Sequence, residues 1–121
     1  MALITYMEPD FRFENDSGLL IQLVRDGWKQ FNVIFSKGGS VRGGHYHKYN
    51  SEAFYIISGS FRLKVWKGGE PAEEYQIRSG DMFRIDPYVF HTFEYLEDTH
   101  LVSMYSSGVE LDENTKDIWT E

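Results

Sequence analysis

Two histidines separated by one residue, with a glutamate close behind, constrain this chain more than any other feature. His45 and His47 leave the same face if they lie on a β-strand, because strand side chains alternate with a period of two. Glu52 follows after four residues, which is enough for a turn into a second strand. Two imidazoles and one carboxylate suit Zn, Fe, Ni or Mn. The alternative is that these are ordinary surface or core histidines beside a strand-end carboxylate.

Flanking glycines make the spacing more specific. Residues 39–59 fit the pattern G-x5-H-x-H-x3,4-E-x6-G at every fixed position. This pattern is the first motif of the cupin family, which the chain therefore resembles. The second cupin motif, G-x5-P-x-G-x2-H-x3-N, is matched in part, with Gly80 and His91 at the expected separation. The resemblance covers about residues 30–106.

The second motif departs from the family pattern at three positions. Asp86 stands where the proline belongs, Tyr88 replaces the glycine, and Tyr95 replaces the asparagine. A bulky residue disfavours the left-handed backbone that glycine adopts easily. The sequence therefore does not support a tight glycine-type turn at residue 88.

The cupin resemblance implies an all-β jelly-roll barrel, or double-stranded β-helix, with a metal centre. One divalent transition metal ion is implied, Zn, Ni, Mn or Fe. The ligands carried over to this chain are His45, His47, Glu52 and His91.

The distribution of apolar residues independently predicts a β-sandwich or barrel, as a single domain over residues 1–121. Short runs rich in β-branched and aromatic residues alternate with glycine turns. The run 31–35 is apolar on both faces, as expected for a strand buried on each side. Near the end, Ile118 and Trp119 are expected either in a short C-terminal helix or packed on a partner. His100 is expected in an exposed turn without a role.

The charge balance excludes several partners. Nineteen acidic and 12 basic residues give a net charge of −7, which argues against nonspecific binding to nucleic acid or to an anionic membrane. The chain has no cysteine, so disulfide and thiolate chemistry are excluded. No apolar stretch is long enough to span a membrane, and the first residues lack the pattern of a signal peptide. We expect a cytoplasmic protein.

The stretch from Arg42 to Lys48, RGGHYHK, adds a second resemblance. It is similar to the signature of nucleotide-sugar epimerase and isomerase cupins, such as the C-terminal cupin domain of capsular-polysaccharide reductase/epimerase proteins. The likeness extends upstream through residues 16–20 and 31–39, although an arginine and a proline of that pattern are missing. It implies a small-molecule substrate, a keto-sugar that is nucleotide-linked, and a homodimer.

Three side chains are candidates for substrate binding or catalysis. The planar, permanently charged fork of Arg42 suits a diphosphate or carboxylate, and a salt bridge to an acid is the alternative. Lys48 is a weaker candidate for the same role. The family resemblance implies a tyrosine acid opposite a histidine base, and Tyr95 would share a strand face with His91. Filling the core or an interface is the alternative for any tyrosine.

Three functions follow from these observations. The first is isomerisation or epimerisation of a keto-sugar by proton abstraction next to a carbonyl. The second is a cupin dioxygenase that uses Fe or Ni, for which the three histidines and glutamate are an equally good ligand set. The third is a sugar- or metabolite-binding module without catalysis. If all three histidines bind the metal, none of them is free to act as the base at the same time. The sequence does not resolve that conflict.

Overall fold

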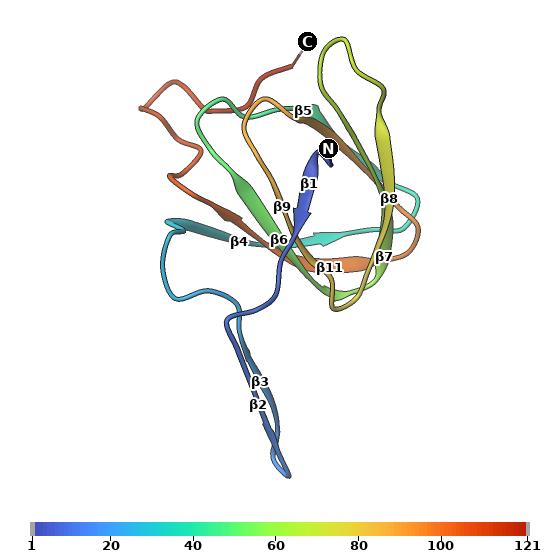
Figure 1. Cartoon of the computed structure of the whole chain (residues 1–121), viewed down its shortest axis with the longest axis vertical. Helices are drawn as coiled ribbons and strands as arrows, with labels where there is room; N and C mark the ends of the chain where they lie inside the picture. The colour runs from blue at the N-terminus through green and yellow to red at the C-terminus, as the bar shows by residue number, and fades with distance from the viewer. Residues whose placement is uncertain (1, 121) are drawn as a thin grey trace.

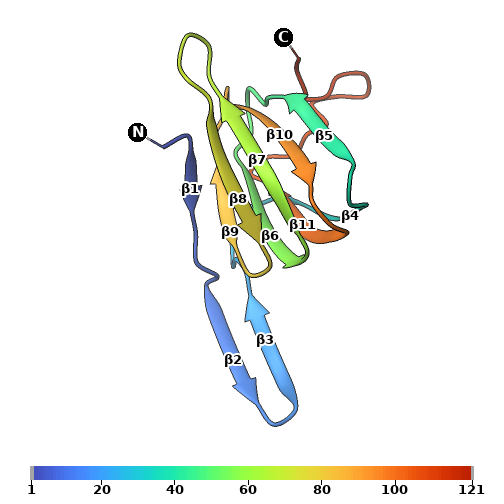
Figure 2. The ribbon, with the colours of Figure 1, turned by 90° about the vertical axis from the view of Figure 1, so that its right-hand side faces the viewer.

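Two antiparallel sheets enclose the interior of this protein, whose computed structural model describes residues 2–120 (Figures 1 and 2). The strands are β1 (Ile4–Tyr6), β2 (Phe11–Asn15), β3 (Gly18–Gln22), β4 (Gln30–Ser36), β5 (Val41–His45), β6 (Glu52–Ser58), β7 (Ser60–Trp66), β8 (Glu73–Arg78), β9 (Met82–Ile85), β10 (Phe90–Tyr95) and β11 (Thr99–Tyr105). One sheet has the order β1-β9-β6-β11-β4, and the other has the order β5-β10-β7-β8. The prediction of an all-β jelly-roll barrel is confirmed.

Period-two alternation places a large aromatic core between the two sheets. In β7, Phe61, Leu63 and Val65 are fully buried while the residues between them face outward. Phe61 stacks on Phe93 of β10 with ring centroids 4.7 Å apart, and Phe54 of β6 packs against the same ring at 5.1 Å. Each such side chain contributes roughly 1.5–3 kcal/mol through burial. Phe54 and Phe93 of this core also line the cavity that contains the candidate functional residues.

A second, smaller cluster lies on the outer face of the five-stranded sheet. Ala53 of β6, Met82 of β9 and Met104 of β11 are buried there. The segment between β3 and β4 covers them with Val24 and Trp28. The chain therefore crosses the outside of this sheet before it enters β4.

Strands β2 and β3 form a separate hairpin that projects away from the barrel (Figures 1 and 2). Residues 11–20 are all exposed.

The prediction that β4 is buried on both faces is wrong for the single chain, because Phe31, Val33 and Phe35 are 55%, 71% and 52% exposed.

The C-terminal segment follows the barrel rim without a helix. The predicted helix at Ile118 and Trp119 is wrong, because the backbone N–H and C=O of Trp119 pair with Tyr46 at 3.0 and 2.9 Å. No part of residues 2–120 forms a helix, so a helix that could cross a membrane is also missing there. His100 is exposed as predicted, but it lies in β11 and contacts Phe35 edge-on.

The turn at residue 88 forms even though the glycine of the family motif is missing. Tyr88 adopts the left-handed conformation itself, with φ of 70°. Its backbone N–H donates to the carbonyl of His47 at 2.7 Å. The expectation drawn from the missing glycine is therefore wrong, and this hydrogen bond ties the approach to β10 to the histidine loop.

Candidate functional site

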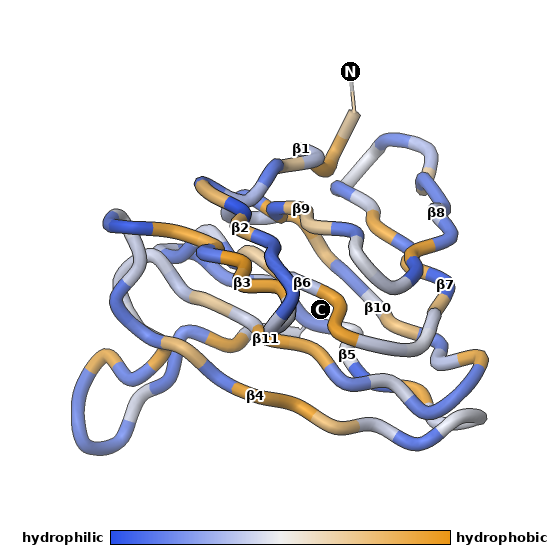
Figure 3. Tube along the Cα trace, turned by 90° about the horizontal axis from the view of Figure 1, so that it is seen from below, coloured by the Kyte–Doolittle hydropathy of each residue, from blue (hydrophilic) through white to orange (hydrophobic). Residues whose placement is uncertain are grey.

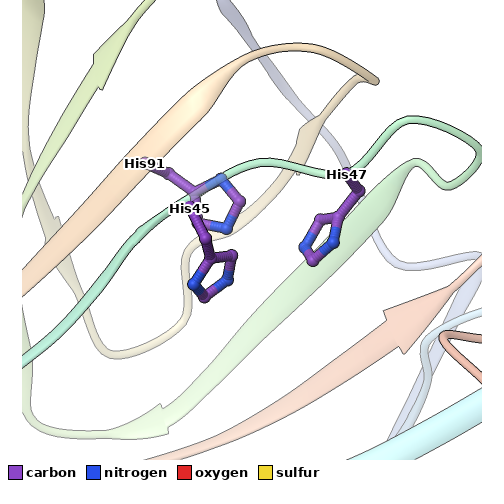
Figure 4. A group of neighbouring side chains, drawn as sticks. All are labelled: His45, His47 and His91. Atoms are coloured by element: carbon purple, nitrogen blue, oxygen red, sulfur yellow. The ribbon is translucent and has the colours of Figure 1, made fainter. Parts of the chain in front are cut away.

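Three imidazoles from separate positions in the chain converge inside the barrel (Figure 4). His45 ends β5, and His91 lies directly opposite it on β10 in the antiparallel register. His47 follows in the next loop. One ring nitrogen from each of the three can be chosen so that all lie within 4.8 Å of one another. Residues more than forty positions apart are thus brought to one point by strand pairing.

A glycine bulge sets the position of His91 relative to His45. The β5–β10 register shifts between His91 and Thr92. Gly43 has φ of +115°, and a Cβ atom there would lie 2.5 Å from the carbonyl oxygen of His91. Only glycine allows the two strands to approach this closely.

Glu52 completes the cluster from the first position of β6. Its Oε1 lies 3.0 Å from Nε2 of His47 and 3.8 Å from Nε2 of His91. A tetrahedral ion with ligands about 2.0–2.2 Å away holds its donor atoms roughly 3.3–3.6 Å apart. The three histidines therefore lie close enough together to hold a metal ion, and Glu52 contacts two of them.

Burial keeps two of the three histidines neutral. Desolvation, then the charge of His47, lowers the pKa of His45 to about 4. Desolvation, then the charges of His45 and His47, lowers the pKa of His91 to about 3. Both imidazoles therefore present lone pairs at neutral pH, which is the form that binds metals.

His47 has a different environment. Burial alone would lower the pKa of His47, but the hydrogen bond and charge of Glu52 outweigh it and raise that pKa. Its Nδ1 lies 2.6 Å from the backbone carbonyl of Asp117. A carbonyl can only accept, so Nδ1 carries a proton and Nε2 faces Glu52. This is the arrangement in which a second partner fixes the orientation of a ligand imidazole.

Asp117 anchors the C-terminal segment to the histidine loop. Its side chain is buried and accepts hydrogen bonds from the backbone N–H groups of Lys48 and Tyr49 and from the side chains of Asn50 and Trp119, at 2.7–2.9 Å. Sequence reasoning missed Asp117. Three of these contacts join residues almost 70 positions apart, and an acidic residue in a polar tail gives no signal of burial.

A cavity of about 420 Å³ opens beside the imidazoles. Apolar side chains of the core line part of its wall, and the polar lining residues are Arg42, His45, Glu52, His91, Tyr95 and Tyr105. The Nε of Arg42 donates to Ser36 Oγ at 2.8 Å, and Nη2 reaches the carbonyl of Phe35 at 3.5 Å. These contacts hold an exposed guanidinium at the cavity wall.

Two buried phenols face the same cavity. Burial raises the pKa of Tyr95, although a hydrogen bond with Ser36 and the charge of Arg42 act in the other direction. Burial, followed by the charge of Glu52, raises the pKa of Tyr105 well above its usual value. Both groups therefore remain protonated donors at neutral pH. The structure also places Tyr95 on the same face of β10 as His91, as the four-residue spacing predicts.

Lys48 lies elsewhere. Its Nζ sits 3.9 Å from the centre of the half-buried Trp119 ring, a cation–π contact, and it does not line the cavity. Among the described residues that line the cavity, Arg42 is the one cationic side chain besides the histidines. The structure thus brings Arg42 and Tyr95 to the imidazole cluster but leaves Lys48 away from it.

Known proteins share this fold and part of this sequence. The chain is 31% identical over 77 residues to quercetin 2,3-dioxygenase of Bacillus subtilis, covering 62% of this chain and 21% of that enzyme. Capsular polysaccharide assembling protein CapF of Staphylococcus aureus superposes with a TM-score of 0.68 at 21% identity, covering 91% of this chain and 33% of that one. The chain therefore spans only a small part of these two proteins.

Two smaller sugar-modifying enzymes are also similar in structure. An rmlC epimerase of Mycobacterium tuberculosis has a TM-score of 0.72 at 17% identity, covering 93% of this chain and 66% of that one. The 3,4-ketoisomerase QdtA of Thermoanaerobacterium thermosaccharolyticum has a TM-score of 0.74 at 16% identity, covering 95% and 86%. At these identities the superpositions show the fold alone. The sequence model of the Cupin domain matches residues 31–106, more than half of the chain, so this protein belongs to the cupin family.

Proposed function

We propose that this cupin is an isomerase or epimerase that acts on a nucleotide-linked keto-sugar by moving a proton next to its carbonyl. One observation carries the proposal. A single cavity holds an imidazole–carboxylate cluster, two protonated phenols and one arginine. The similarity in fold to an epimerase and to a ketoisomerase determined with TDP-4-keto-6-deoxyglucose supports it.

Each group has a distinct task in this proposal. Arg42 binds the anionic part of the substrate, because its planar fork pairs with phosphate oxygens. The substrate carbonyl lies toward the imidazole cluster. Tyr95 returns a proton to the reacting carbon, for which a raised pKa is suitable because the phenol stays protonated until it is used. Burial among Phe54 and Phe93 excludes water from this end of the cavity.

His45, His47, Glu52 and His91 are the residues that would hold one divalent transition metal. When bound, such an ion polarises a carbonyl oxygen and stabilises the enolate formed after proton loss. Without an ion, Glu52 faces the cavity and shares a hydrogen bond with His47, so this pair can take up the proton.

A dioxygenase is the second candidate. Three histidines and one glutamate are a suitable ligand set for Fe or Ni. The specific observation in its favour is the 31% identity to a quercetin 2,3-dioxygenase, which is higher than the identity to any of the sugar enzymes above.

Exchange of substrate hydrogen with solvent tests the first proposal. The protein is incubated with TDP-4-keto-6-deoxyglucose in D2O, and loss of the proton signals next to the carbonyl is followed by NMR. We expect exchange with wild type, at least about a hundredfold slower exchange with Tyr95→Phe, and unchanged exchange with Tyr46→Phe, whose ring lies outside the cavity. Equal exchange by both variants would remove Tyr95 from the mechanism.

Two further measurements separate the alternatives. Elemental analysis of wild type beside His47→Ala tests the metal centre, which requires about one ion per chain in wild type and its loss in the variant. Oxygen consumption with quercetin and Fe- or Ni-loaded protein, without any exchange of sugar hydrogens, would favour the dioxygenase. A substrate-dependent rise in melting temperature with neither activity would favour a binding module.

A further inference from the structure

A buried serine hydroxyl lies beside the arginine and the tyrosine of the cavity wall. Ser36 is the last residue of β4 and is 2% exposed. It shares the inner face of this strand with Ile34, which lines the cavity, because strand side chains alternate. Figure 3 shows that the apolar stretch of β4 gives way to hydrophilic residues in the turn that follows it. The proposed mechanism uses Arg42 and Tyr95 but not this hydroxyl.

Strand pairing brings Ser36, Arg42 and Tyr95 together from three strands. Arg42 of β5 stands opposite Phe93 of β10, so Tyr95, two residues further along, is its diagonal neighbour on the same face. Diagonal neighbours in an antiparallel pair lie within reach of long side chains. A tight turn leads from β4 to β5, and the backbone N–H of Gly39 in that turn donates to the carbonyl of Tyr95 at 2.8 Å. The turn is therefore fixed to the residue whose phenol faces the cavity.

The donors and acceptors of these three side chains give their hydrogen bonds a single direction. The Nε of Arg42 donates to Ser36 Oγ at 2.8 Å, and a guanidinium cannot accept. The serine proton is then left for the oxygen of Tyr95, with which Ser36 forms a hydrogen bond. Because the serine donates to the phenol oxygen, the proton of the phenol is not used within this chain of hydrogen bonds. That proton is available to a ligand in the cavity.

The guanidinium of Arg42 keeps its charge available at the other end. None of the ion pairs formed among residues 2–120 includes Arg42. The side chain is exposed, and its other hydrogen bond within these residues goes from Nη2 to the carbonyl of Phe35 at 3.5 Å. An anion that pairs with the Nη groups leaves the Nε contact to Ser36 in place, because a guanidinium offers several separate donors. Arg42 therefore has the donors to bind an anion and the serine at the same time.

We propose that Ser36 is a positioning residue that joins anion binding at Arg42 to proton delivery by Tyr95. The task of Tyr95 rests on the proposed function, whereas the hydrogen-bond chain does not depend on it. The serine holds the phenol oxygen, so the phenol is oriented before the substrate binds. Hydrogen bonds in such a chain polarise one another, so the charge of Arg42 makes the phenol a better proton donor than it would be through burial alone.

The charges that face Tyr95 agree with this role. Burial raises the pKa of Tyr95, and the charge of Glu52 on β6 acts in the same direction, whereas the hydrogen bond with Ser36 and the charge of Arg42 lower it. The other titratable groups that line the cavity carry no full charge at neutral pH, and they are His45, His91 and Tyr105. Ser36 and Arg42 are therefore the groups that limit the rise in the pKa of this phenol.

Fluorine NMR tests the hydrogen bond without any substrate. Difluorotyrosine, whose phenol titrates at lower pH, is introduced at position 95 as the one fluorinated residue of the metal-free protein. In Ser36→Ala the phenol should bind its proton about tenfold more tightly than in the parent protein, because alanine cannot donate to the phenolate. Ser40→Ala is the matched control, since it removes a hydroxyl of the same turn that donates to the Lys37 carbonyl, and it should leave the titration unchanged. Equal titration of Ser36→Ala and the parent would overturn the inference.

Hydrogen exchange in D2O separates positioning from binding. With TDP-4-keto-6-deoxyglucose, Ser36→Ala should lower the exchange rate at saturation about tenfold and change KM less than about threefold, whereas Arg42→Gln should also raise KM. In the Tyr95→Phe background, Ser36→Ala should cause no further loss, because the two residues act as one unit. Additive losses would overturn the inference. If wild type exchanged no hydrogen, the proposed function would fail, and the fluorine titration would still decide whether the hydrogen-bond chain exists.

Discussion

Replacement of Asp117 by alanine should destabilise the barrel and loosen the histidine cluster at the same time. The carboxylate is fully buried, and the hydrogen bonds it accepts have no substitute in the described structure. Burial alone would raise the pKa of Asp117, but these hydrogen bonds prevail and lower it, so the group is charged at neutral pH. The variant leaves several donors without this acceptor, among them one N–H of the buried Asn50 amide, whose other N–H still donates to the Gly108 carbonyl, and the half-buried Trp119 indole.

The expected loss follows from those unpaired donors. A hydrogen bond to a charged group contributes about 1.5–3 kcal/mol, and a single buried donor left unpaired costs about 1–3 kcal/mol. Because some donors regain water, we expect a total loss of about 3–5 kcal/mol, compared with about 5–15 kcal/mol for the whole stability of a domain. The His47 Nδ1 contact is made by the backbone of the same residue, so metal affinity should fall about 10–100-fold.

Urea denaturation at pH 7 and calorimetric metal titration measure the two effects. Glu113→Ala is the matched control, since Glu113 is an exposed acid of the same segment. A lowered folded pKa means that the stabilisation by Asp117 is present above pH ~4 and is lost as pH falls further. The difference in free energy of unfolding between wild type and Asp117→Ala should therefore become smaller at acidic pH. Equal unfolding free energies for Asp117→Ala and Glu113→Ala would refute the anchoring role.

Three further predictions concern the backbone and the buried imidazoles. Gly43→Ala should lower the free energy of unfolding by about 2–4 kcal/mol, because the added Cβ would collide with the His91 carbonyl. Gly44→Ala has open space around it and should lower it by only about 1–2 kcal/mol, from backbone strain. Similar losses for the two variants in urea denaturation would contradict this. Tyr88→Val should cost about 1–3 kcal/mol because β-branched residues resist positive φ, while Tyr88→Gly should stay within about 1 kcal/mol of wild type in thermal melts. Burial lowers the pKa of His91 to about 3, so between pH 6.5 and 5 the unfolded chain gains a proton at this residue and the folded chain does not. The free energy of unfolding of metal-free wild type should therefore fall by about 2 kcal/mol over that range because of His91, and this part of the fall should be missing in His91→Leu. Parallel pH profiles for the two proteins would contradict the last prediction.

The sequence predicted the barrel and the imidazole cluster because both depend on local spacing. The motif spacing identifies His45 and His47 as one pair, although His47 lies in the loop after β5 and not on the strand, and the spacing from Gly80 brings in His91. Asp117 could not be found in this way, because its burial results from contacts with residues 47–50 that only the folded chain creates. The prediction about the turn at Tyr88 was wrong for a related reason. Local strain disfavours tyrosine there, but the hydrogen bond to His47 and the flanking strands override that preference.

The contact between His47 and Glu52 separates the two kinds of chemistry open to this pocket. Nδ1 of His47 already donates to the Asp117 carbonyl, so the 3.0 Å contact between Nε2 and Glu52 Oε1 requires a second proton between them. Both atoms must become lone-pair donors before they can hold a metal ion, so loading the site expels about one proton. The raised pKa of His47 retains that proton near neutral pH, and metal affinity should therefore fall up to about tenfold per pH unit below the folded pKa. Calorimetry in buffers of different ionisation enthalpy counts the released proton, and a value near zero would contradict this protonation state. If the proton is found, the loaded pocket must rely on a phenol such as Tyr95 for proton transfer, and only the metal-free pocket can use the His47–Glu52 pair as a base.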